Sequence, residues 1–521
     1  MEERNNFIEN RNNKKRYSQN YPKHETQKKK ISYFIKSKLL STSTKLLNKI
    51  HTLKTKENHD NIYKFKTGVL KKNKKKLIIE FSFSCFYKSF LIFILILILL
   101  FGVLLLLNHS QKENDINIPN DLNIKIAFYY VSIRYGGVQR VIATLINFLS
   151  REKYFTIYLI TNRGRLRDEY PIPNTTKRII LPEKRINVFE AVETENIDIL
   201  IFNFYCTFYP QEIGKLNKLN KTKVIYYLHS SFLFFVYNNK YNIKSTIYSA
   251  LINSKYVFSL IPIENDYLFK KWGINNSILI DNPSSIEYDL VTPSDLSEKN
   301  IVLIGRGFDT KKRYDLSIKA MVNIIKEVPD CKMNIISGKY NNLDHLIRNL
   351  SLENYVSFTG FHNTIEKYLK KASLHILSSL SESYSLALSE TKIYGIPSII
   401  CGLDYLALSR GGTVIIYDDN PDTIAKEAIK ILKDDKYRKK LGKEARESMI
   451  KHKNDLILKK WVKVLLAIYK GDDISYKKYA DNTLTEEEAK TIIHNQLQIF
   501  RKRKLRFSGL SFEKFESFSF L

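Results

Sequence analysis

Residues 374–399 read LHILSSLSESYSLALSETKIYGIPSI, and this stretch decides the fold class. Its mainly apolar start indicates a buried strand, the hydroxyl-rich loop that follows carries Glu382, and a short helix then carries Glu390. Gly395 and Pro397 end the helix and lead into another strand. Ligands of open parallel sheets bind at the carboxyl ends of the strands, so both carboxylates are expected beside a ligand. Carboxylates accept hydrogen bonds from hydroxyl groups, which suits a polyhydroxylated ligand such as a sugar nucleotide.

Two glutamates eight positions apart also occur on solvated helix faces, because 26% of this chain is charged. The strand before the pair, the Ser-Tyr-Ser-Leu loop at 383–386 and the Gly-x-Pro break after it favour a ligand site. We therefore treat residues 382–390 as the first candidate site.

From about Asn123 to residue 470, strand-like and helix-like segments alternate. Strands are predicted at 124–131, 156–160, 198–203, 223–228 and 256–261, and in a second series at 301–304, 333–337, 355–359, 374–378, 398–401 and 413–417. Helices are predicted at 138–149, 315–326, 341–349, 364–371, 386–394, 422–433 and 454–470. This pattern predicts an α/β fold of two Rossmann-like, doubly wound parallel-sheet domains facing a cleft, at 123–296 and 297–470.

The composition is that of a globular protein with an uneven charge. Of 521 residues, 44% are hydrophobic and 12% aromatic. The net charge is +31, but residues 1–76 hold 22 Lys and Arg against 6 Asp and Glu, a net +16. No helix-turn-helix, zinc-finger or RNA-recognition pattern accompanies the basic residues, so no specific nucleic-acid partner is expected. The cysteines indicate neither a zinc site nor a disulfide framework, because Cys85, Cys206, Cys331 and Cys401 lie far apart.

One segment is predicted to anchor the chain in a membrane. Residues 89–107 carry no charge, and nineteen residues rise about 28 Å as a helix, which matches the bilayer core. Five lysines lie at 71–76, so the positive-inside rule predicts a type II protein with a cytosolic N-terminus and a lumenal catalytic domain, in the Golgi or endoplasmic reticulum. The expected segments are a basic, disordered region at 1–76, the anchor at 77–108 and a short stem at 109–122.

The tail at 471–521 has no assigned role. Thr485 and Glu488 have the spacing of a helix capping box, and a basic cluster follows at 501–506. A solvated helix is the plain expectation for this tail. The alternative is a contact with an anionic acceptor or a lipid surface.

A glycine pair in the first domain is a candidate for binding an anion. Gly136 and Gly137 lie between the first strand and the first helix, where backbone N–H groups can approach an anion at a helix N-terminus. The Gly-x-Gly-x-x-Gly pattern is absent, which counts against an ordinary nicotinamide-binding domain. A glycine turn required only for packing is the other interpretation.

A basic loop occupies the same place in the second domain. Gly305 and Arg306 follow the strand at 301–304, and Lys312 comes six residues after Arg306, with Lys311 as its rival. An Arg and a Lys at a strand edge can clamp a diphosphate, since charge-assisted hydrogen bonds contribute about 1.5–3 kcal/mol each. The other interpretation is a solvated basic loop.

These motifs together resemble the retaining GT-B glycosyltransferases of family 4. Glu382 and Glu390 match the Glu-x7-Glu motif, and the sequence Gly-Gly-Val-Gln-Arg-Val from Gly136 is similar to the family's Gly-Gly-x-Glu-Arg-Val loop. Gln139 replaces the usual Glu there. Many relatives have Glu-Gly-Phe-Gly where this chain has Glu-Ser-Tyr-Ser at 382–385, so its sugar preference can differ.

The resemblance implies roles for individual residues. His229, at the end of a strand, resembles the His that the family directs at the donor sugar or its β-phosphate; a structural His is the alternative. The implied catalytic residues are Arg306, Lys312, Glu382 and His229. Glu382 would orient the sugar hydroxyls and Glu390 the ribose, and the Gly360–Phe361 loop would contact the base. The implied donor-binding residues are Gly136, Gly137, Gly305, Lys311, Gly360, Phe361, Ser383, Tyr384, Ser385, Leu386 and Glu390.

The resulting expectation is a membrane-anchored glycosyltransferase that moves a hexosyl group from a UDP- or GDP-sugar to a hydroxyl of a glycan, lipid or protein. The resemblance implies retention of the anomeric configuration, no metal, and no cofactor besides the nucleotide-diphosphate sugar as co-substrate. A non-catalytic glycan- or nucleotide-binding scaffold of the same fold is the first alternative. A nucleic-acid or membrane-surface protein that acts through its basic ends is the second.

Overall fold

The computed structural model describes residues 119–503, apart from positions 120, 135, 165–168, 182–187, 205–213, 217, 230–250, 253, 363, 473 and 475–483. Within these residues, no helix combines the length and apolar character that a membrane crossing requires. The predicted span at 89–107 lies outside the described residues, as does the basic segment at 1–76. The span and its orientation therefore stay predictions.

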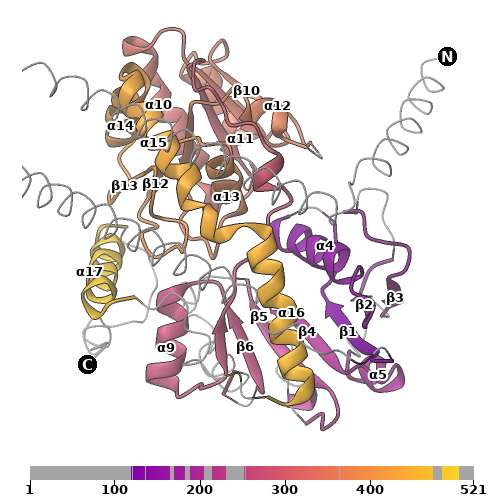
Figure 1. Ribbon diagram of the computed structural model, residues 1–521. Coiled ribbons are helices and arrows are strands. Elements are labelled where there is room, and N and C mark those ends of the chain that lie inside the picture. Colours follow the sequence, from indigo (N-terminus) through magenta and orange to yellow (C-terminus); the bar gives the residue numbers. More distant parts are fainter. Residues whose placement is uncertain are drawn as a thin grey trace, which may run out of the picture. The chain divides into compact units, whose positions relative to one another are not determined.

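The first domain contains a seven-stranded sheet in which all neighbouring strands are parallel (Figure 1). Its strand order is β3-β2-β1-β4-β5-β6-β7. The elements are β1 (Ile124–Tyr129), α4 (Gly137–Leu149), β2 (Phe155–Thr161), β3 (Lys177–Ile180), α5 (Val188–Thr194), β4 (Ile199–Phe204), β5 (Lys223–Leu228), β6 (Tyr256–Ser259), α9 (Pro262–Trp272) and β7 (Ser277–Leu279).

The second domain contains a six-stranded parallel sheet with the order β10-β9-β8-β11-β12-β13. Its elements are β8 (Asn300–Ile304), α10 (Tyr314–Glu327), β9 (Lys332–Ile336), α11 (Asn341–Asn349), β10 (Val356–Phe358), α12 (Glu366–Leu369), β11 (Leu374–Leu377), α13 (Leu386–Ile393), β12 (Ser398–Cys401), β13 (Thr413–Ile416), α14 (Pro421–Lys433) and α15 (Asp435–Ser448). The order reverses between β8 and β11, and this switch point is where open α/β sheets bind ligands.

The predicted class, two parallel-sheet α/β domains, is confirmed. The sequence pattern did not predict five elements of these domains: β3, β7, α5, α9 and α15. β3 has no fully buried residue, and β7 is only three residues long, so neither has a clear apolar signal. α15 is strongly polar, which weakened its helical periodicity although Leu441 and Ala445 are buried.

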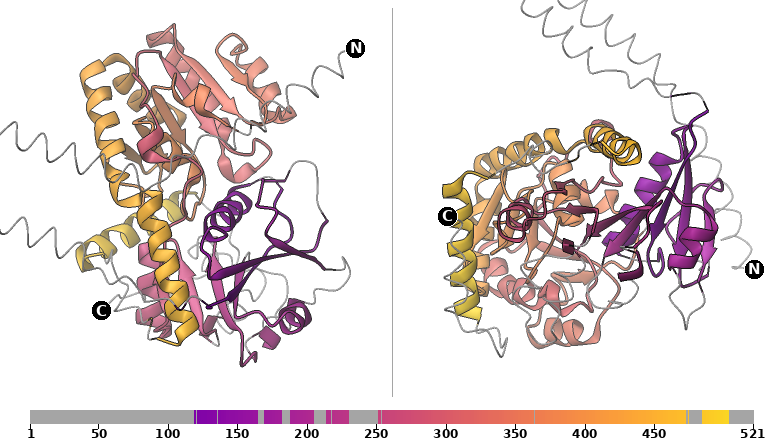
Figure 2. Two further views of the ribbon diagram at one scale, coloured as in Figure 1. Left: turned by 45° about the vertical axis from the view of Figure 1, so that its right-hand side comes forward. Right: turned by 90° about the horizontal axis from the view of Figure 1, so that it is seen from below.

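Helix α16 (Asn454–Lys470) joins the second domain to the first. Trp461 is fully buried and packs edge-on against Tyr227 of β5 and Phe258 of β6. Its indole N–H donates to the Asp281 carbonyl across 3.4 Å. The left view of Figure 2 shows α16 lying lengthwise along the first domain. The apolar face of this helix therefore completes the core of the first domain.

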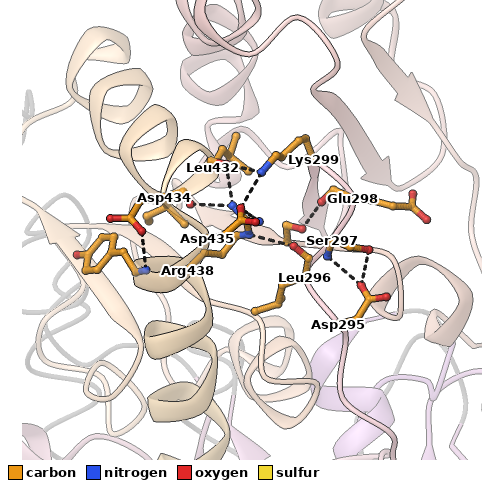
Figure 3. A network of polar contacts seen from close by, with 12 residues as sticks. Asp295, Leu296, Ser297, Glu298, Lys299, Leu432, Asp434, Asp435 and Arg438 are labelled. Carbon is orange, nitrogen blue, oxygen red and sulfur yellow. Dashed lines mark hydrogen bonds and ion pairs between the residues drawn. The ribbon is translucent and has the colours of Figure 1, made fainter.

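The linker between the sheets is fastened to helix α15 (Figure 3). Arg438 is buried, and its Nε donates to the Leu296 carbonyl across 3.0 Å while its Nη1 donates to the Leu432 carbonyl across 2.7 Å. Lys299 donates to the same Leu432 carbonyl and pairs with Asp435 at 3.2 Å. This network holds the start of β8 in place, which fixes the loop that follows the strand.

The tail forms helix α17 (Glu486–Arg503), and the expectation of a solvated helix is wrong. The capping box is confirmed: the Thr485 N–H donates to Glu488 across 2.9 Å, and the Glu488 N–H donates to the Thr485 hydroxyl across 3.2 Å. Ala489, Ile492 and Ile499 are buried, so α17 packs on the protein with an apolar face. Uncharged polar residues separate the few apolar ones in the middle of this helix, so its buried face gives only a weak helical pattern.

Candidate functional site

Lys312 and Glu382 meet at the switch point of the second sheet. The Lys312 ammonium lies 2.6 Å from Glu382 Oε1, and both side chains are mostly buried. Lys312 follows β8 in a short 3-10 turn, and Glu382 follows β11, which is the neighbouring strand. Because parallel strands end at one edge, residues seventy positions apart become neighbours.

Hydroxyl groups fix the loop that carries Glu382. Ser379 donates to Glu382 Oε1 across 2.7 Å, and Ser378 donates to the Lys312 carbonyl across 2.9 Å. The Tyr405 hydroxyl lies 3.2 Å from both the N–H and the carbonyl oxygen of Glu382. Tyr405 therefore fixes the backbone of Glu382, and Lys312 and Ser379 fix its carboxylate.

Gly305 allows Lys312 to approach the backbone closely. Its φ is +145°, and a Cβ there would lie 3.2 Å from Lys312 Cε and 2.9 Å from the Tyr314 hydroxyl. A larger residue would displace the lysine side chain. Gly305 thus has a steric role beside the ion pair.

The loop from Ser383 to Leu386 joins the two domains. Ser383 donates to the His229 carbonyl across 2.8 Å, and Tyr384 is buried. Ser385 has φ +63° and caps α13 by accepting a hydrogen bond from the Leu388 N–H. Glycine adopts such a φ readily, which explains why the resembling motif has Gly at this position. One serine hydroxyl thus bonds to the first domain and the other caps its own helix.

Gly136 and Gly137 lie across from this loop, at the start of α4. Gly136 has φ +128°, and a Cβ there would lie 2.5 Å from Gln139 Oε1. A Cβ on Gly137 would lie 3.7 Å from Leu386 Cδ1, so the glycine loop contacts the second domain. The N-terminus of α4 therefore faces the start of α13.

Glu390 is fully buried in α13 and is held from the first domain. Its Oε1 lies 2.7 Å from Arg140 Nη2, on α4, and accepts a hydrogen bond from Ser285 across 3.4 Å. Its Oε2 has no hydrogen-bond partner among the described residues. Burial raises the pKa of Glu390, and the Arg140 guanidinium opposes that rise. One carboxylate oxygen is thus buried without a hydrogen-bond partner in the part of the chain that the structure describes.

His229 ends β5 and is buried. Its Nε2 lies 2.8 Å from Asn203 Oδ1, whereas the amide nitrogen of Asn203 donates to the Tyr129 carbonyl. Burial lowers the pKa of His229 to about 3, so the ring is neutral at ordinary pH. Because Nε2 faces an acceptor, it carries the proton and Nδ1 is left as an acceptor.

Arg306, Gly360 and Phe361 lie at the edge of the second sheet but not in the ion-pair cluster. Arg306 is 47% exposed and pairs with Asp309 at 3.2 Å, so it does not share Glu382 with Lys312. Gly360 has φ +87°, and a Cβ there would meet nothing within 4 Å. Phe361 is 56% exposed, and its ring covers Gly338. The Arg306 and Phe361 side chains are thus largely exposed in this structure.

The comparisons identify the second domain. Residues 291–448 match the family model described as glycosyl transferases group 1. The second domain is therefore similar to the group 1 glycosyl transferases. The domain includes Lys312, Glu382 and Glu390, so both carboxylates of the Glu-x7-Glu pattern and the lysine lie within the matched residues.

Curated relatives of the group 1 glycosyl transferase domain are bacterial enzymes. N-acetyl-alpha-D-glucosaminyl L-malate synthase from Bacillus anthracis is 30% identical over 159 residues, which are 29% of this chain and 41% of that protein. Poly(glycerol-phosphate) alpha-glucosyltransferase from Bacillus subtilis is 24% identical over 296 residues, 52% of this chain and 44% of that protein. The chain therefore spans less than half the length of these two relatives.

A longer match reaches a Campylobacter jejuni enzyme, N-acetylgalactosamine-N,N'-diacetylbacillosaminyl-diphospho-undecaprenol 4-alpha-N-acetylgalactosaminyltransferase. It is 24% identical over 369 residues, 62% of this chain and 94% of that protein. Among solved structures, sucrose-phosphate synthase from Thermosynechococcus elongatus has a TM-score of 0.56 at 15% identity, covering 67% of this chain and all of that chain. Anabaena HepE in complex with UDP and glucose has a TM-score of 0.53 at 15% identity, covering 66% of this chain and all of that one. At these identities the structural likeness shows the fold, and the two sheets are consistent with GT-B.

Several residues around the group 1 glycosyl transferase site were not predicted. Arg140 was part of the Gly-Gly-Val-Gln-Arg-Val motif, so a signal was present. Ser379 lies in the hydroxyl-rich loop that carries Glu382, so a signal was present for it too. Ser285 and Tyr405 have no motif of their own, and only the fold brings them to Glu390 and Glu382. Across the part of the chain that the structure describes, no group of three His, Cys, Asp or Glu residues could hold a metal ion. Metal-independence stays a prediction.

Proposed function

We propose that this chain is a glycosyltransferase that moves a hexosyl group from a nucleotide-diphosphate sugar to a hydroxyl acceptor, with retention of the anomeric configuration. The observation that supports this most is the pair of carboxylates at the switch point of a group 1 glycosyl transferase domain. Glu382 is held by Lys312, and Glu390 is buried with one oxygen unpartnered among the described residues.

Glu390 suits the ribose of the donor. A buried acceptor without a partner costs about 1–3 kcal/mol, and a ribose hydroxyl that donates to Oε2 would remove this cost. Burial raises the pKa of Glu390, and Arg140 opposes that rise and so favours the ionised form, which is the stronger acceptor. A hydrogen bond from a ribose hydroxyl to Glu390 Oε2 would therefore contribute to the affinity for the donor.

Lys312 and the start of α13 suit the departing nucleoside diphosphate. The first N–H groups of a helix lack partners within the helix and attract an anion. The N–H groups at the start of α13 and the Lys312 ammonium would stabilise the negative charge that develops on the diphosphate as its bond to the sugar breaks. Arg306 would add a second cation if its side chain turned from Asp309 toward the diphosphate. Removing one hydrogen-bond donor of this kind typically lowers kcat by a factor of about 10²–10³.

His229 suits a sugar hydroxyl better than a phosphate. Its neutral ring holds the proton on Nε2, against Asn203, so Nδ1 can only accept a hydrogen bond. A phosphate oxygen is itself an acceptor and would be repelled. We therefore assign His229 to a hydroxyl of the donor sugar, beside Glu382.

The acceptor and the location are part of the proposal. The Campylobacter relative's name describes a diphospho-undecaprenol acceptor, and that of the Bacillus subtilis relative describes poly(glycerol-phosphate). A glycan or glycolipid hydroxyl is therefore the proposed acceptor. Anchoring by residues 89–107, with the basic segment at 1–76 on the cytosolic side, would hold the catalytic domains close to a lipid-linked acceptor.

A thermal-shift screen of the full chain against UDP, GDP and their sugars tests the proposal. A ligand that binds only the folded state raises the melting temperature, so one nucleotide should stabilise the chain. Transfer to a glycan or glycolipid acceptor with the same donor would then show the activity. If no nucleotide sugar stabilises the chain, the donor site assigned to Glu382 and Glu390 is wrong.

A further inference from the structure

Helix α17 ends beside the loop that carries Glu382, although it lies outside both sheets and outside the matched residues 291–448. Its last described residue, Arg503, has a side chain that is only 8% exposed. Arg503 Nη1 donates to the Leu380 carbonyl across 3.2 Å, and Nη2 donates to the Cys401 carbonyl across 3.4 Å. Leu380 precedes Glu382 by two positions.

A shared carboxylate connects Arg503 to the other side of the same loop. Asp419 lies 3.0 Å from Arg503 Nε and 2.5 Å from Arg313 Nη1. Arg313 Nε in turn donates to the Ser378 carbonyl across 2.8 Å. Two guanidinium groups joined by one carboxylate therefore hold the carbonyls on both sides of Ser379, which itself donates to Glu382.

The rest of α17 fixes the position of Arg503. Gln496 is buried and donates to the Gly402 carbonyl across 2.9 Å and to Asp404 Oδ1 across 2.6 Å. A Cβ on Gly402 would lie 2.6 Å from Ile499 Cδ1, so the helix approaches the end of β12 at a glycine. This approach places the end of α17 at the carboxyl edge of the second sheet.

We propose that α17 is a positioning element for the donor site, in which Arg503 holds the loop at 378–382 in its binding conformation. This rests on the proposed function, because it assigns the loop to the donor. Arg503 touches no reacting atom. Without it, the Leu380 carbonyl loses a charged donor and the segment that carries Glu382 gains conformational freedom, so donor binding must order it again.

Hydrogen exchange in the full chain, without nucleotide, tests the positioning role directly. Arg503→Met should speed exchange of the amides at 379–385 by about tenfold, the factor expected for losing one hydrogen bond to a charged group. Arg410→Met is the matched control, because Arg410 pairs with Glu488 at 2.6 Å in the first turn of α17. That contact lies at the opposite end of a helix about 27 Å long, so the loop should exchange as in wild type. Unchanged loop exchange in Arg503→Met overturns the proposal.

Binding measurements separate this role from general stabilisation. The dissociation constant of the nucleoside diphosphate that stabilises the wild type should rise about tenfold in Arg503→Met and stay constant in Arg410→Met. If the wild type binds neither UDP nor GDP, the proposed function fails, while the exchange result still decides the role of Arg503. Equal affinity in wild type and folded Arg503→Met overturns the proposal.

A wild-type experiment covers the case in which Arg503→Met does not fold. Coupling between two sites is reciprocal, so nucleotide binding should slow amide exchange in the last turns of α17. Slower exchange at 496–503 supports the proposal. Exchange there that is the same with and without bound nucleotide overturns it.

Discussion

Arg140 Nη2 lies 2.7 Å from Glu390 Oε1, so a carboxylate buried in the second domain is neutralised by a cation from the first. Arg140 belongs to the helix that follows the glycine loop, and Glu390 to the helix that follows the Glu382 loop. The other oxygen of this carboxylate is buried without a hydrogen-bond partner among the described residues. Under the proposed function, the residue that would bind the donor ribose is therefore also a contact between the domains.

Glu390→Gln should weaken nucleotide binding by about tenfold or more, because a ribose hydroxyl loses an ionised acceptor. Isothermal titration with the nucleotide and a transfer assay measure the effect. Glu366→Gln is the control, since Glu366 is an exposed carboxylate paired only with Lys370 at the surface in the described structure. Absence of transfer by both wild type and Glu390→Gln would favour the non-catalytic scaffold.

Arg140→Met should destabilise the protein more at about pH 8 than at about pH 5. Burial raises the pKa of Glu390, and an acid with a raised pKa contributes stability below that pKa and loses it as the pH rises through it. Removing Arg140 raises the pKa further and leaves a buried, unpaired charge at high pH. Melting temperatures of wild type and variant across this range measure the difference.

The control for the Arg140 experiment is Arg348→Met. Arg348 pairs with Asp344 on an exposed helix face, and its side chain is 55% exposed. Removal of the Arg348 guanidinium should lower the free energy of unfolding only slightly, and by nearly the same amount at both pH values. Surface ion pairs contribute at most about 1 kcal/mol to stability. A pH-independent loss in Arg140→Met would show that Glu390 does not depend on Arg140 for its charge.

Lys312→Met should lower kcat by about 10²-fold, because it removes a cation from the leaving diphosphate and from Glu382. Lys311→Met should lower kcat by much less than Lys312→Met, because Lys312 is the lysine whose ammonium lies 2.6 Å from Glu382. Steady-state kinetics with saturating acceptor compare the two variants. A larger loss in Lys311→Met would move the assignment to Lys311.

His229→Ala should lower transfer activity by a similar factor at every pH between about 5 and 8. Burial lowers the pKa of His229 to about 3, so the imidazole does not change its charge in this range. The pH–rate profile of wild type should therefore show no limb that disappears in the variant. A limb near pH 6.5 that His229→Ala abolishes would show that the imidazole titrates during turnover.

Local sequence patterns predicted the two sheets, the basic loop that carries Lys312 and the loop that carries Glu382. The helices at 341–349 and 454–470 and the strands at 223–228 and 398–401 have the predicted bounds, because each has a continuous apolar pattern of its own. Loops that follow parallel strands share one sheet edge, so the sequence places Lys312 and Glu382 at that edge, whereas their pairing follows from the adjacency of β8 and β11 in the structure. Short or polar elements such as β7 and α15 lack that pattern.

Only the tertiary structure decided which groups hold these residues. Arg140 reaches Glu390 from another sheet, and Arg503 reaches Leu380 across 123 positions of sequence. No periodicity connects such residues, because a salt bridge or a hydrogen bond depends on where whole helices pack. The sequence by itself thus determined which chemical groups lie at the edge of the second sheet. The packing of α4 and α17 determined the partners of these groups. The physical reason is that a buried polar group without a partner costs free energy, so packing brings partners to it.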